Sequence, residues 1–384
     1  MATKGKSQQK KQPIQISNVE VFDNEYRFTL FNIPTPYANG LRRIILSDIP
    51  INVVRTENEQ VNQCKFEYNT SRLHNEILKQ RLSCIPIHNK DLEKLAGKYT
   101  IEVEVENKSD EIQYVTTEDF RLKNKETNQF MSKDETRQIF PPDPMTHRYI
   151  DFCRLRPKIS DAIPGEKVKF SADISIGCAK DNSMFNVVSK CTYQNTPDPE
   201  KIQKEWERRE IELREQYTTI TQEEVEFEKK NFELLDAERF YVPNSFDFRV
   251  QSIGIYDNEE LVKKACIVLH NKMVDFIKAL GENEVPIQLS ETSMDNTYDV
   301  ILENEDYTVG KILELELYEK YYDTKDPSQK KLNFCAFKKF HPHYTEGVLR
   351  LGFVETVKKE QVRYVMKEVA VAAQEKVKSL YDLF

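Results

Sequence analysis

Alternating apolar and polar residues open the chain and predict β-strands there. Residues 14–33 contain two such runs, and shorter runs stand at 51–54 and 64–68. A period of two places every second side chain on the same face of a strand, so each run offers one apolar face for burial. We therefore expect the fold to begin with a pair of strands and to add others soon afterwards.

The first strands lead into a segment, 32–46, in which apolar residues recur at helical spacing. Thr35 stands at an N-cap position and Pro36 at the first helical position. The stripe expected to pack against the sheet is Tyr37, Leu41, Ile44 and Ile45. The opposite side carries Asn39, Arg42, Arg43 and Leu46. Two guanidinium forks beside an apolar side chain are typical of a protein interface, although a surface helix with solvated arginines has the same pattern.

A second helix is predicted within residues 68–87, where Pro86 ends it. Its apolar residues fall on two sides: Leu73, Ile77 and Cys84 on one, and Leu78 and Leu82 on the other. Because both faces are apolar, this helix lies either in the centre of a domain or under another chain.

From about residue 88 the pattern changes to strands separated by loops rich in Pro and Asp. Strands are predicted at 99–105, 111–115 and 167–176. The block ends in a charged helical stretch, 199–235, of which most is expected to be a solvated face. We interpret the block as a β-rich domain.

A clean alternating strand at 245–255 precedes an amphipathic helix at 258–280, and Gly281 is expected to end that helix. Its apolar seam is Leu261, Ala265, Leu269, Met273, Phe276 and Leu280. We interpret this strand and helix as the return of the first domain, which makes the β-rich block an insertion.

The last hundred residues repeat this order of elements. Strands are predicted at 298–302, 332–340 and 348–354, with a helix at 307–321 after the first of them. A long helix closes the chain, with the seam Val362, Val365, Val369, Ala372, Val377 and Leu380. Spacings of three and four predict that it packs against the helix at 258–280.

Composition narrows the function. The 384 residues carry a net charge of −8, which disfavours a surface that holds DNA or RNA directly. The chain contains no apolar run near the roughly 18 residues that span a membrane. Residues 1–13 are rich in Lys and Gln and are expected to be a disordered tail, with a nucleic-acid role for the lysines as the alternative. Seven scattered cysteines without a CxxC pair indicate reduced thiols.

Neither a catalytic nor a metal site is predicted. The chain has no Asp-x-Asp pair for two Mg²⁺ ions and no Walker lysine. The pair His341 and His343 lacks an evident third ligand, so we expect it to be structural. We expect no cofactor.

Segments 39–47 and 69–86 together resemble the alpha motif of the RNA polymerase alpha-subunit family. The first reads N-G-L-R-R-I-I-L-S from Asn39, against a family pattern of N-A-L-R-R-I-L-L-S. The second reads N-T-S-R-L-H-N-E-I-L from Asn69 and closes with Arg81-Leu82 and Ile85-Pro86. This family includes the bacterial alpha subunit, the archaeal D-type subunit and the third subunit of eukaryotic RNA polymerase II. Several relatives carry a cysteine-rich metal loop, but no Cys stands between residues 88 and 147 here, so we predict no metal.

The last hundred residues resemble the eleventh subunit of RNA polymerase II and the archaeal L-type subunit. The marks are E-D-Y-T-V-G-K-I-L from Glu305 and F-K-K-F-H-P from Phe337. The apolar stripe of the first helix repeats in the helix at 307–321, but Arg42 and Arg43 have no counterpart there. We therefore expect only the N-terminal copy to make an arginine-anchored external contact.

The resemblance implies that both halves of a heterodimer lie in one chain, as in large cytoplasmic DNA viruses of eukaryotes. The implied fold class is α+β, an alpha-subunit dimerisation fold in the form of an intramolecular pseudo-dimer with an inserted β-rich domain. The expected domains are a disordered tail at 1–13, an alpha-like dimerisation domain at 14–88 and 236–282, an inserted β-rich domain with a charged helical tail at 89–235, and a second, eleventh-subunit-like dimerisation domain at 283–384.

The implied function is a non-catalytic assembly platform of a multisubunit DNA-directed RNA polymerase. Its alpha motif would dock the second-largest catalytic subunit before the largest subunit joins, and small subunits resembling the tenth and twelfth would follow. The partner-binding residues expected from the resemblance are Asn39, Arg42, Arg43, Leu46, Asn69, Glu76, Leu78, Arg81 and Leu82, although Glu76 and Arg81 could instead form an internal ion pair.

The working place implied is the host-cell cytoplasm (the viral factory) and the virion for a viral protein, or the nucleus for a cellular one. Contact with nucleic acid would be indirect. The alternative is a free-standing regulatory or nucleic-acid-binding protein that reuses the dimerisation fold, and the acidic balance of the chain counts against it.

Overall fold

The computed structural model describes residues 13–160, 162–217, 219–291, 294–324 and 327–384, and shows mixed helix and sheet, an α+β protein. The chain forms two compact units. The first unit comprises Met1–Ile44, Lys190–Gln251 and Val262–Phe384, and the second unit comprises Ile45–Ser189 and Ser252–Leu261. These boundaries differ from the domain limits expected from the sequence. Residues 190–235 belong to the first unit, and residues 45–88 share the second unit with 89–189.

An antiparallel sheet forms the N-terminal part of the first unit. Its strands, in spatial order, are β1 (Gln15–Phe22), β2 (Glu25–Phe31), β12 (Tyr241–Ser252) and β11 (Val188–Pro197). Alternation gives the two central strands one apolar face, on which Phe28 stacks against Phe248 with ring centroids 5.1 Å apart. The C-terminal Phe384 meets Phe28 edge-on, so the end of the chain closes the core of its first sheet.

The C-terminal part of the first unit holds a second sheet with the same topology. Its strands, in spatial order, are β13 (Ile287–Leu289), β14 (Thr297–Leu302), β16 (Gly347–Phe353) and β15 (Leu332–Lys338). In both sheets the first two strands are neighbours, and the fourth position is held by the strand that precedes the third in sequence.

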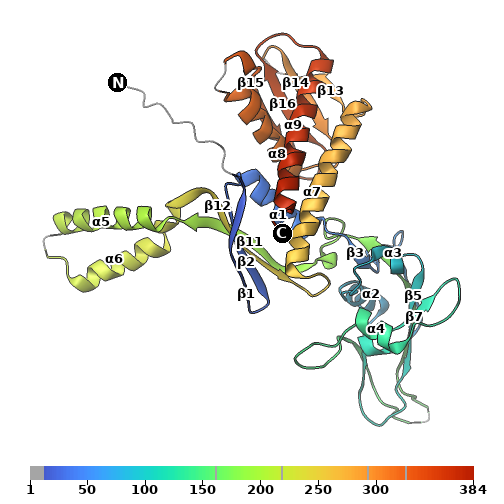
Figure 1. Cartoon of the computed structure of the whole chain (residues 1–384). Helices are drawn as coiled ribbons and strands as arrows, with labels where there is room; N and C mark the ends of the chain where they lie inside the picture. Colours follow the sequence, from blue (N-terminus) through green and yellow to red (C-terminus); the bar gives the residue numbers. More distant parts are fainter. Residues whose placement is uncertain (1–12, 161, 218, 292–293, 325–326) are drawn as a thin grey trace. The chain divides into compact units, whose positions relative to one another are not determined.

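The helices repeat in the same way (Figure 1). Helix α1 (Thr35–Ser47) follows β2, and α8 (Tyr307–Leu317) follows β14. Helix α7 (Asn258–Gly281) follows β12, and α9 (Lys359–Tyr381) follows β16. A π-helical turn, Tyr318–Tyr322, extends α8. The order of elements predicted for the last hundred residues is confirmed.

One aromatic ring leaves no room for a side chain at two glycines near the second sheet. A Cβ atom on Gly310 or on Gly347 would lie 2.4 Å from the ring of Phe337, which is buried between them. Since no side chain fits at that distance, the ring packs directly on backbone on both sides.

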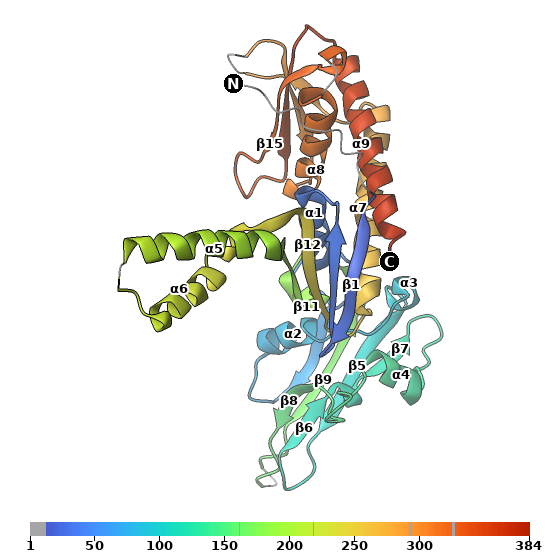
Figure 2. The ribbon, with the colours of Figure 1, turned by 60° about the vertical axis from the view of Figure 1, so that its left-hand side comes forward.

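Helices α7 and α9 lie side by side in both views (Figures 1 and 2), and His270 and Gln374 make a hydrogen bond across them, 3.1 Å long. The seam residues that the structure buries are Leu261, Ala265, Leu269, Met273, Leu280, Val362, Val365, Val369, Val377 and Leu380.

Two seam residues need correction, because Phe276 and Ala372 are only half-buried. The alanines buried on α9 are Ala370 and Ala373. The run of small apolar residues around them fits more than one helical stripe, so spacing alone could not select the buried pair.

Two helix ends also differ from prediction. Helix α7 continues through Gly281, and Asn283, with φ 60°, adopts the left-handed conformation while the N–H of Glu284 bonds the carbonyl of Ala279. The helix predicted within 68–87 is short, α2 (Asn75–Ser83), because the side chain of Asn69 bonds the local backbone and holds a turn before it.

The second unit is β-rich. Its main sheet orders β4 (Cys64–Asn69), β9 (Lys167–Asp173), β5 (Tyr99–Glu106) and β7 (Arg121–Asn124). Two smaller pairs join β6 (Gln113–Thr116) to β8 (Asp151–Leu155) and β3 (Ile51–Val53) to β10 (Ser175–Gly177). Helices α2, α3 (Leu92–Leu95) and α4 (Lys133–Ile139) cover a core in which the rings of Phe120, Phe152 and Phe170 meet.

A helical hairpin joins β11 to β12 and projects from the first sheet (Figures 1 and 2). It consists of α5 (Pro199–Gln216) and α6 (Gln222–Leu234). Its own small core contains Trp206, Val225, Phe232 and Ala237, so the charged stretch at 199–235 is a packed pair of helices. Short 3₁₀ turns stand at Thr117–Asp119, Ser183–Phe185, Ala237–Arg239 and Pro327–Gln329.

Replacing Val365 by Asp is expected to lower the free energy of unfolding by about 3 kcal/mol or more, because the site is 3% exposed and offers the charge no water. The matched control is Lys367→Asp, at an exposed position of the same helix, which should change stability by less than about 0.5 kcal/mol. Urea unfolding measures both. Equal stabilities of the two variants would mean that α9 buries another face.

Candidate functional site

Helix α1 begins as its sequence dictates. The carbonyl of Pro34 accepts from the N–H groups of Tyr37 and Ala38, which closes the first turn. The predicted core stripe is confirmed, since its four members are at most 2% exposed: Tyr37, Leu41, Ile44 and Ile45.

Within the first unit, α1 lies against α8. The hydroxyl of Tyr37 donates to Glu316 Oε1 at 2.6 Å, and Lys376 Nζ on α9 reaches the same oxygen at 2.5 Å. Burial and the charge of Glu316 raise the pKa of Tyr37, which therefore remains the donor. The two helices approach closely at Gly40: a Cβ atom there would lie only 3.2 Å from Ile312 Cδ1.

Arg43, expected to be an external anchor, is engaged inside the first unit. Its Nη2 pairs with Asp306 Oδ2 at 2.5 Å, and its Nε donates to Thr308 Oγ1 at 2.8 Å. Both contacts lie at the start of α8, where Asp306 is the N-cap and accepts from the N–H of Thr308 at 2.7 Å. The side chain of Arg43, expected to anchor an external contact, therefore contacts α8 in this unit and is 34% exposed.

The electrostatics of Asp306 follow from that position. Burial opposes its ionisation, but the N–H and hydroxyl of Thr308 and the guanidinium of Arg43 outweigh burial and hold the pKa of Asp306 below its ordinary value. A charged N-cap that also pairs with Arg43 ties α1 to the first turn of α8.

The other predicted residues of α1 remain at the surface. Asn39 Oδ1 accepts from both Nε and Nη2 of Arg42, at 3.1 and 2.9 Å, and both side chains are half-buried. Leu46, which belongs to the second unit, is half-buried as well. The two hydrogen bonds to Asn39 fix the orientation of the Arg42 guanidinium group without any partner protein.

The second predicted segment belongs to the second unit. Arg81 donates from Nε to the carbonyl of Phe152 and from Nη2 to that of Asp151, at 2.8 and 2.7 Å. Glu76 pairs with His74 at 2.7 Å, and its own backbone N–H and His74 lower its pKa. The internal ion pair between Glu76 and Arg81, left open by the sequence, is therefore not the arrangement found.

Two of the predicted contact residues lie inside the second unit. Leu78 is 0% exposed and Leu82 is 2% exposed, and both belong to its core. This burial corrects the expectation for these two side chains. Ile77, on the opposite side of α2, and Cys84, which follows the helix, are exposed instead.

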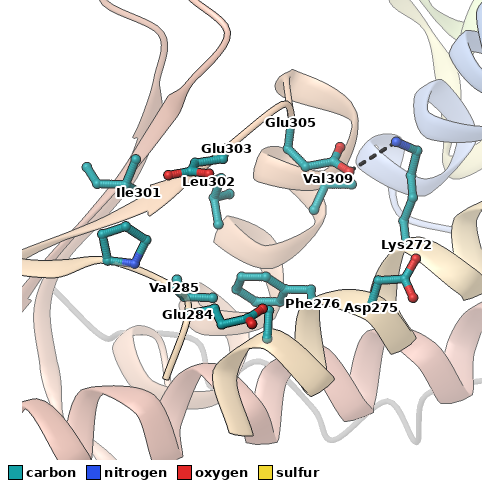
Figure 3. A pocket seen from close by; sticks show the side chains of 12 residues that line it. Lys272, Asp275, Phe276, Glu284, Val285, Ile301, Leu302, Glu303, Glu305 and Val309 are labelled. Atoms are coloured by element: carbon teal, nitrogen blue, oxygen red, sulfur yellow. Dashed lines mark hydrogen bonds and ion pairs between the residues drawn. The ribbon is translucent and has the colours of Figure 1, made fainter. Parts of the chain in front are cut away.

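A surface cavity of about 360 Å³ lies between α7 and the start of the second sheet in the first unit (Figure 3). Phe276 points into it, which explains why this residue is only half-buried. Its rim is acidic, with Asp275, Glu284 and Glu303, while Lys272 pairs with Glu305 at 3.0 Å. None of the residues that line the cavity is a serine, threonine, cysteine or histidine, so it lacks the usual pair of a nucleophile and its base.

Within the described residues, no group of three His, Cys, Asp or Glu side chains could hold a metal ion. Burial raises the pKa of the thiols of Cys64, Cys153, Cys191 and Cys266 to about 12, which makes them poor nucleophiles. In the same part of the chain, no helix is long and apolar enough to cross a membrane.

Sequence reasoning missed the residues that receive α1. Asp306 is the N-cap of α8 and accepts from the N–H of Thr308. An Asp at that position is a sequence signal for the start of a helix, and it could have drawn attention to these two residues. Glu316 and Lys376 carried none, because a buried ion pair between distant segments has no local pattern.

Known proteins are similar to this chain in sequence. A family model described as the RNA polymerase Rpb3/Rpb11 dimerisation domain matches residues 27–273. The DNA-directed RNA polymerase subunit Rpo3 of Pyrococcus furiosus is 23% identical over 290 residues, which cover 70% of this chain and 97% of that protein. The subunit Rpo3 of Thermococcus kodakarensis is 25% identical over 285 residues, 70% of this chain and 98% of that protein.

A plant protein matches as well. The DNA-directed RNA polymerases IV and V subunit 3B of Arabidopsis thaliana is 24% identical over 195 residues, 47% of this chain and 56% of that protein. The family model spans more than half of the chain and includes α1, most of β2 and most of α7. The chain therefore belongs to the RNA polymerase Rpb3/Rpb11 dimerisation domain family.

Proposed function

We propose that this chain is a non-catalytic subunit of a multisubunit DNA-directed RNA polymerase and serves as the platform on which the catalytic subunits assemble. The observation that carries the proposal is the match to polymerase subunits Rpo3 over nearly their whole length. Such a subunit works where its polymerase transcribes, in the nucleus or the cytoplasm.

The first unit is proposed to be an intramolecular pseudo-dimer of two dimerisation folds. Two features support this: the repeated strand order with its paired helices, and the direct contact of α1 with α8. Tethering two halves places each near the other at an effective concentration of order mM, so pairing does not depend on the abundance of a separate chain. A fused form of this kind resembles those of large cytoplasmic DNA viruses of eukaryotes.

The proposed docking face for the second-largest subunit is the outer side of α1, around Asn39 and Arg42. Half-buried, preorganised arginines are frequent anchors of protein interfaces. In the second unit, Asn69, Glu76 and Arg81 are proposed to make a separate contact with the second-largest subunit. The largest subunit and small tenth- and twelfth-subunit-like chains are proposed to join afterwards.

Purification of the tagged chain from its native source tests the function. We expect two very large polymerase subunits, each at one copy per copy of this chain. Recovery of the chain alone, or as a homodimer, would contradict the platform. Tight binding of the purified chain to nucleic acid that weakens steeply with salt would favour the alternative of a free-standing nucleic-acid-binding protein.

The variant Arg42→Glu is expected to abolish capture of the second-largest subunit with an unchanged melting temperature, because it reverses a charge at the proposed contact. Arg249→Glu, an exposed arginine of β12, is the matched control and should leave capture intact. The readout is the ratio of the two polypeptides after affinity purification. Normal capture by Arg42→Glu would remove α1 from the docking face.

A double-mutant cycle separates the roles of Arg43. The variants Arg43→Ala and Asp306→Asn should each reduce the free energy of unfolding by about 0.5–1 kcal/mol, since both side chains are about one-third exposed. The double variant should lose less than the sum, because Asn keeps the N-cap and removes only the ion pair. Additive losses, together with lost capture by Arg43→Ala alone, would restore Arg43 as an external anchor.

The same pair predicts a pH dependence. The folded-state pKa of Asp306 is lowered, so its contribution is fully present above its unfolded pKa of about 3.9 and is lost as the pH falls through the lower folded value. The stability difference between the unaltered protein and Asp306→Asn should therefore shrink from pH 6 towards pH 3. Denaturant unfolding at each pH measures it, and a constant difference would exclude the ion pair as its source.

A further inference from the structure

The two sheets of the first unit differ in one connection. Residues 339–346 join β15 to β16, whereas residues 198–240 join β11 to β12 and contain the hairpin of α5 and α6. Because the second sheet closes with a short loop, the hairpin is not needed to close the first sheet. A packed addition at a surface connection is a common place for binding function.

The hairpin is built to hold its shape. Thr221 and Glu224 form a capping box at the start of α6, and Asp198 caps the start of α5. Arg209 pairs with Asp236 at 2.5 Å, and its guanidinium carbon lies 5.3 Å from the ring centroid of Phe232, within the reach of a cation–π contact. The helices therefore present a fixed surface.

The face of α6 turned away from the hairpin core carries two large apolar side chains among charged ones. Phe227 is 63% exposed and Leu234 is 74% exposed, and they lie seven residues apart, two helical turns along one stripe. The buried residues Val225 and Phe232 occupy the opposite side. Two large apolar groups on one stripe of a charged helix are unusual for a face that meets only water.

The same face is anionic. Residues 198–240 contain 14 acidic and 8 basic side chains. Around the stripe, Glu223, Glu226 and Glu228 are exposed, and none of them makes an ion pair with a described residue. Most of the basic side chains of the hairpin, by contrast, already pair within it: Lys201, Arg208, Arg209, Arg214, Lys229 and Arg239.

We propose that the outer face of α6 is a docking site for an amphipathic segment of a partner protein that is rich in lysine or arginine. The apolar groups of that segment would cover Phe227 and Leu234, and its cations would pair with Glu223, Glu226 and Glu228. Nucleic acid and a second copy of this acidic hairpin would both be repelled by the same carboxylates. The proposal does not depend on the polymerase role.

Fluorescence anisotropy of the full chain tests the site. The probe is a labelled amphipathic peptide of leucine and lysine, about 15 residues long, and its counterpart of leucine and glutamate is the charge control. We expect the lysine peptide to bind and the glutamate peptide to bind at least about tenfold more weakly, with an affinity of the lysine peptide that falls as salt rises.

Three variants locate the binding. Phe227→Ser with Leu234→Ser should weaken the lysine peptide at least about tenfold. Glu223→Lys with Glu226→Lys should weaken it and flatten the salt dependence. Ile211→Ser, at a 60% exposed position of α5, is the matched control and should bind as the unaltered chain does.

The substituted positions are exposed, and an unchanged melting temperature verifies each fold. Equal affinity of the double-serine variant, equal binding of the two peptides, or undiminished binding after residues 198–240 are replaced by a short loop would each overturn the proposal.

Discussion

The first unit depends on a buried carboxylate. Glu316 is 5% exposed, and it accepts from Tyr37 of α1 and Lys376 of α9, so one side chain of α8 joins three helices. Taking a carboxylate out of water costs several kcal/mol unless partners replace the water. Here the partners come from segments far apart in sequence, and the site is complete only when the N-terminal helix, α8 and the C-terminal helix are all in place.

The buried Glu316 joins the two repeated parts of the first unit, because its partners come from α1 and α9. The first unit contains two four-stranded sheets of the same strand order, and two helices follow strands of each sheet. The contact of α1 with α8 joins two unlike features: Gly40 lies against Ile312, and Arg43 pairs with the N-cap Asp306.

Most elements could be predicted from the sequence, because strands and amphipathic helices have local periods. The stripe of α1 and the seam of α7 and α9 followed from spacing, and only Phe276 and Ala372 were misplaced. The contacts of the Arg43 side chain could not be predicted, because its partners Asp306 and Thr308 lie more than 260 residues away in the sequence. The burial of Leu78 was equally hidden, since a helix with two apolar faces does not reveal which of them the fold covers. The resemblance to a family supplied a function for these residues but not their contacts.

The ring of Phe337 limits which substitutions this sequence can accept during evolution. Because it rests on backbone at Gly310 and Gly347, neither glycine can gain even a methyl group while the ring stays. The three positions form a compensating set, in which a smaller residue at 337 opens room for alanine at 310 or 347. Among relatives, substitutions at these sites should therefore appear together, and a lone change at either glycine marks a chain whose second sheet has repacked.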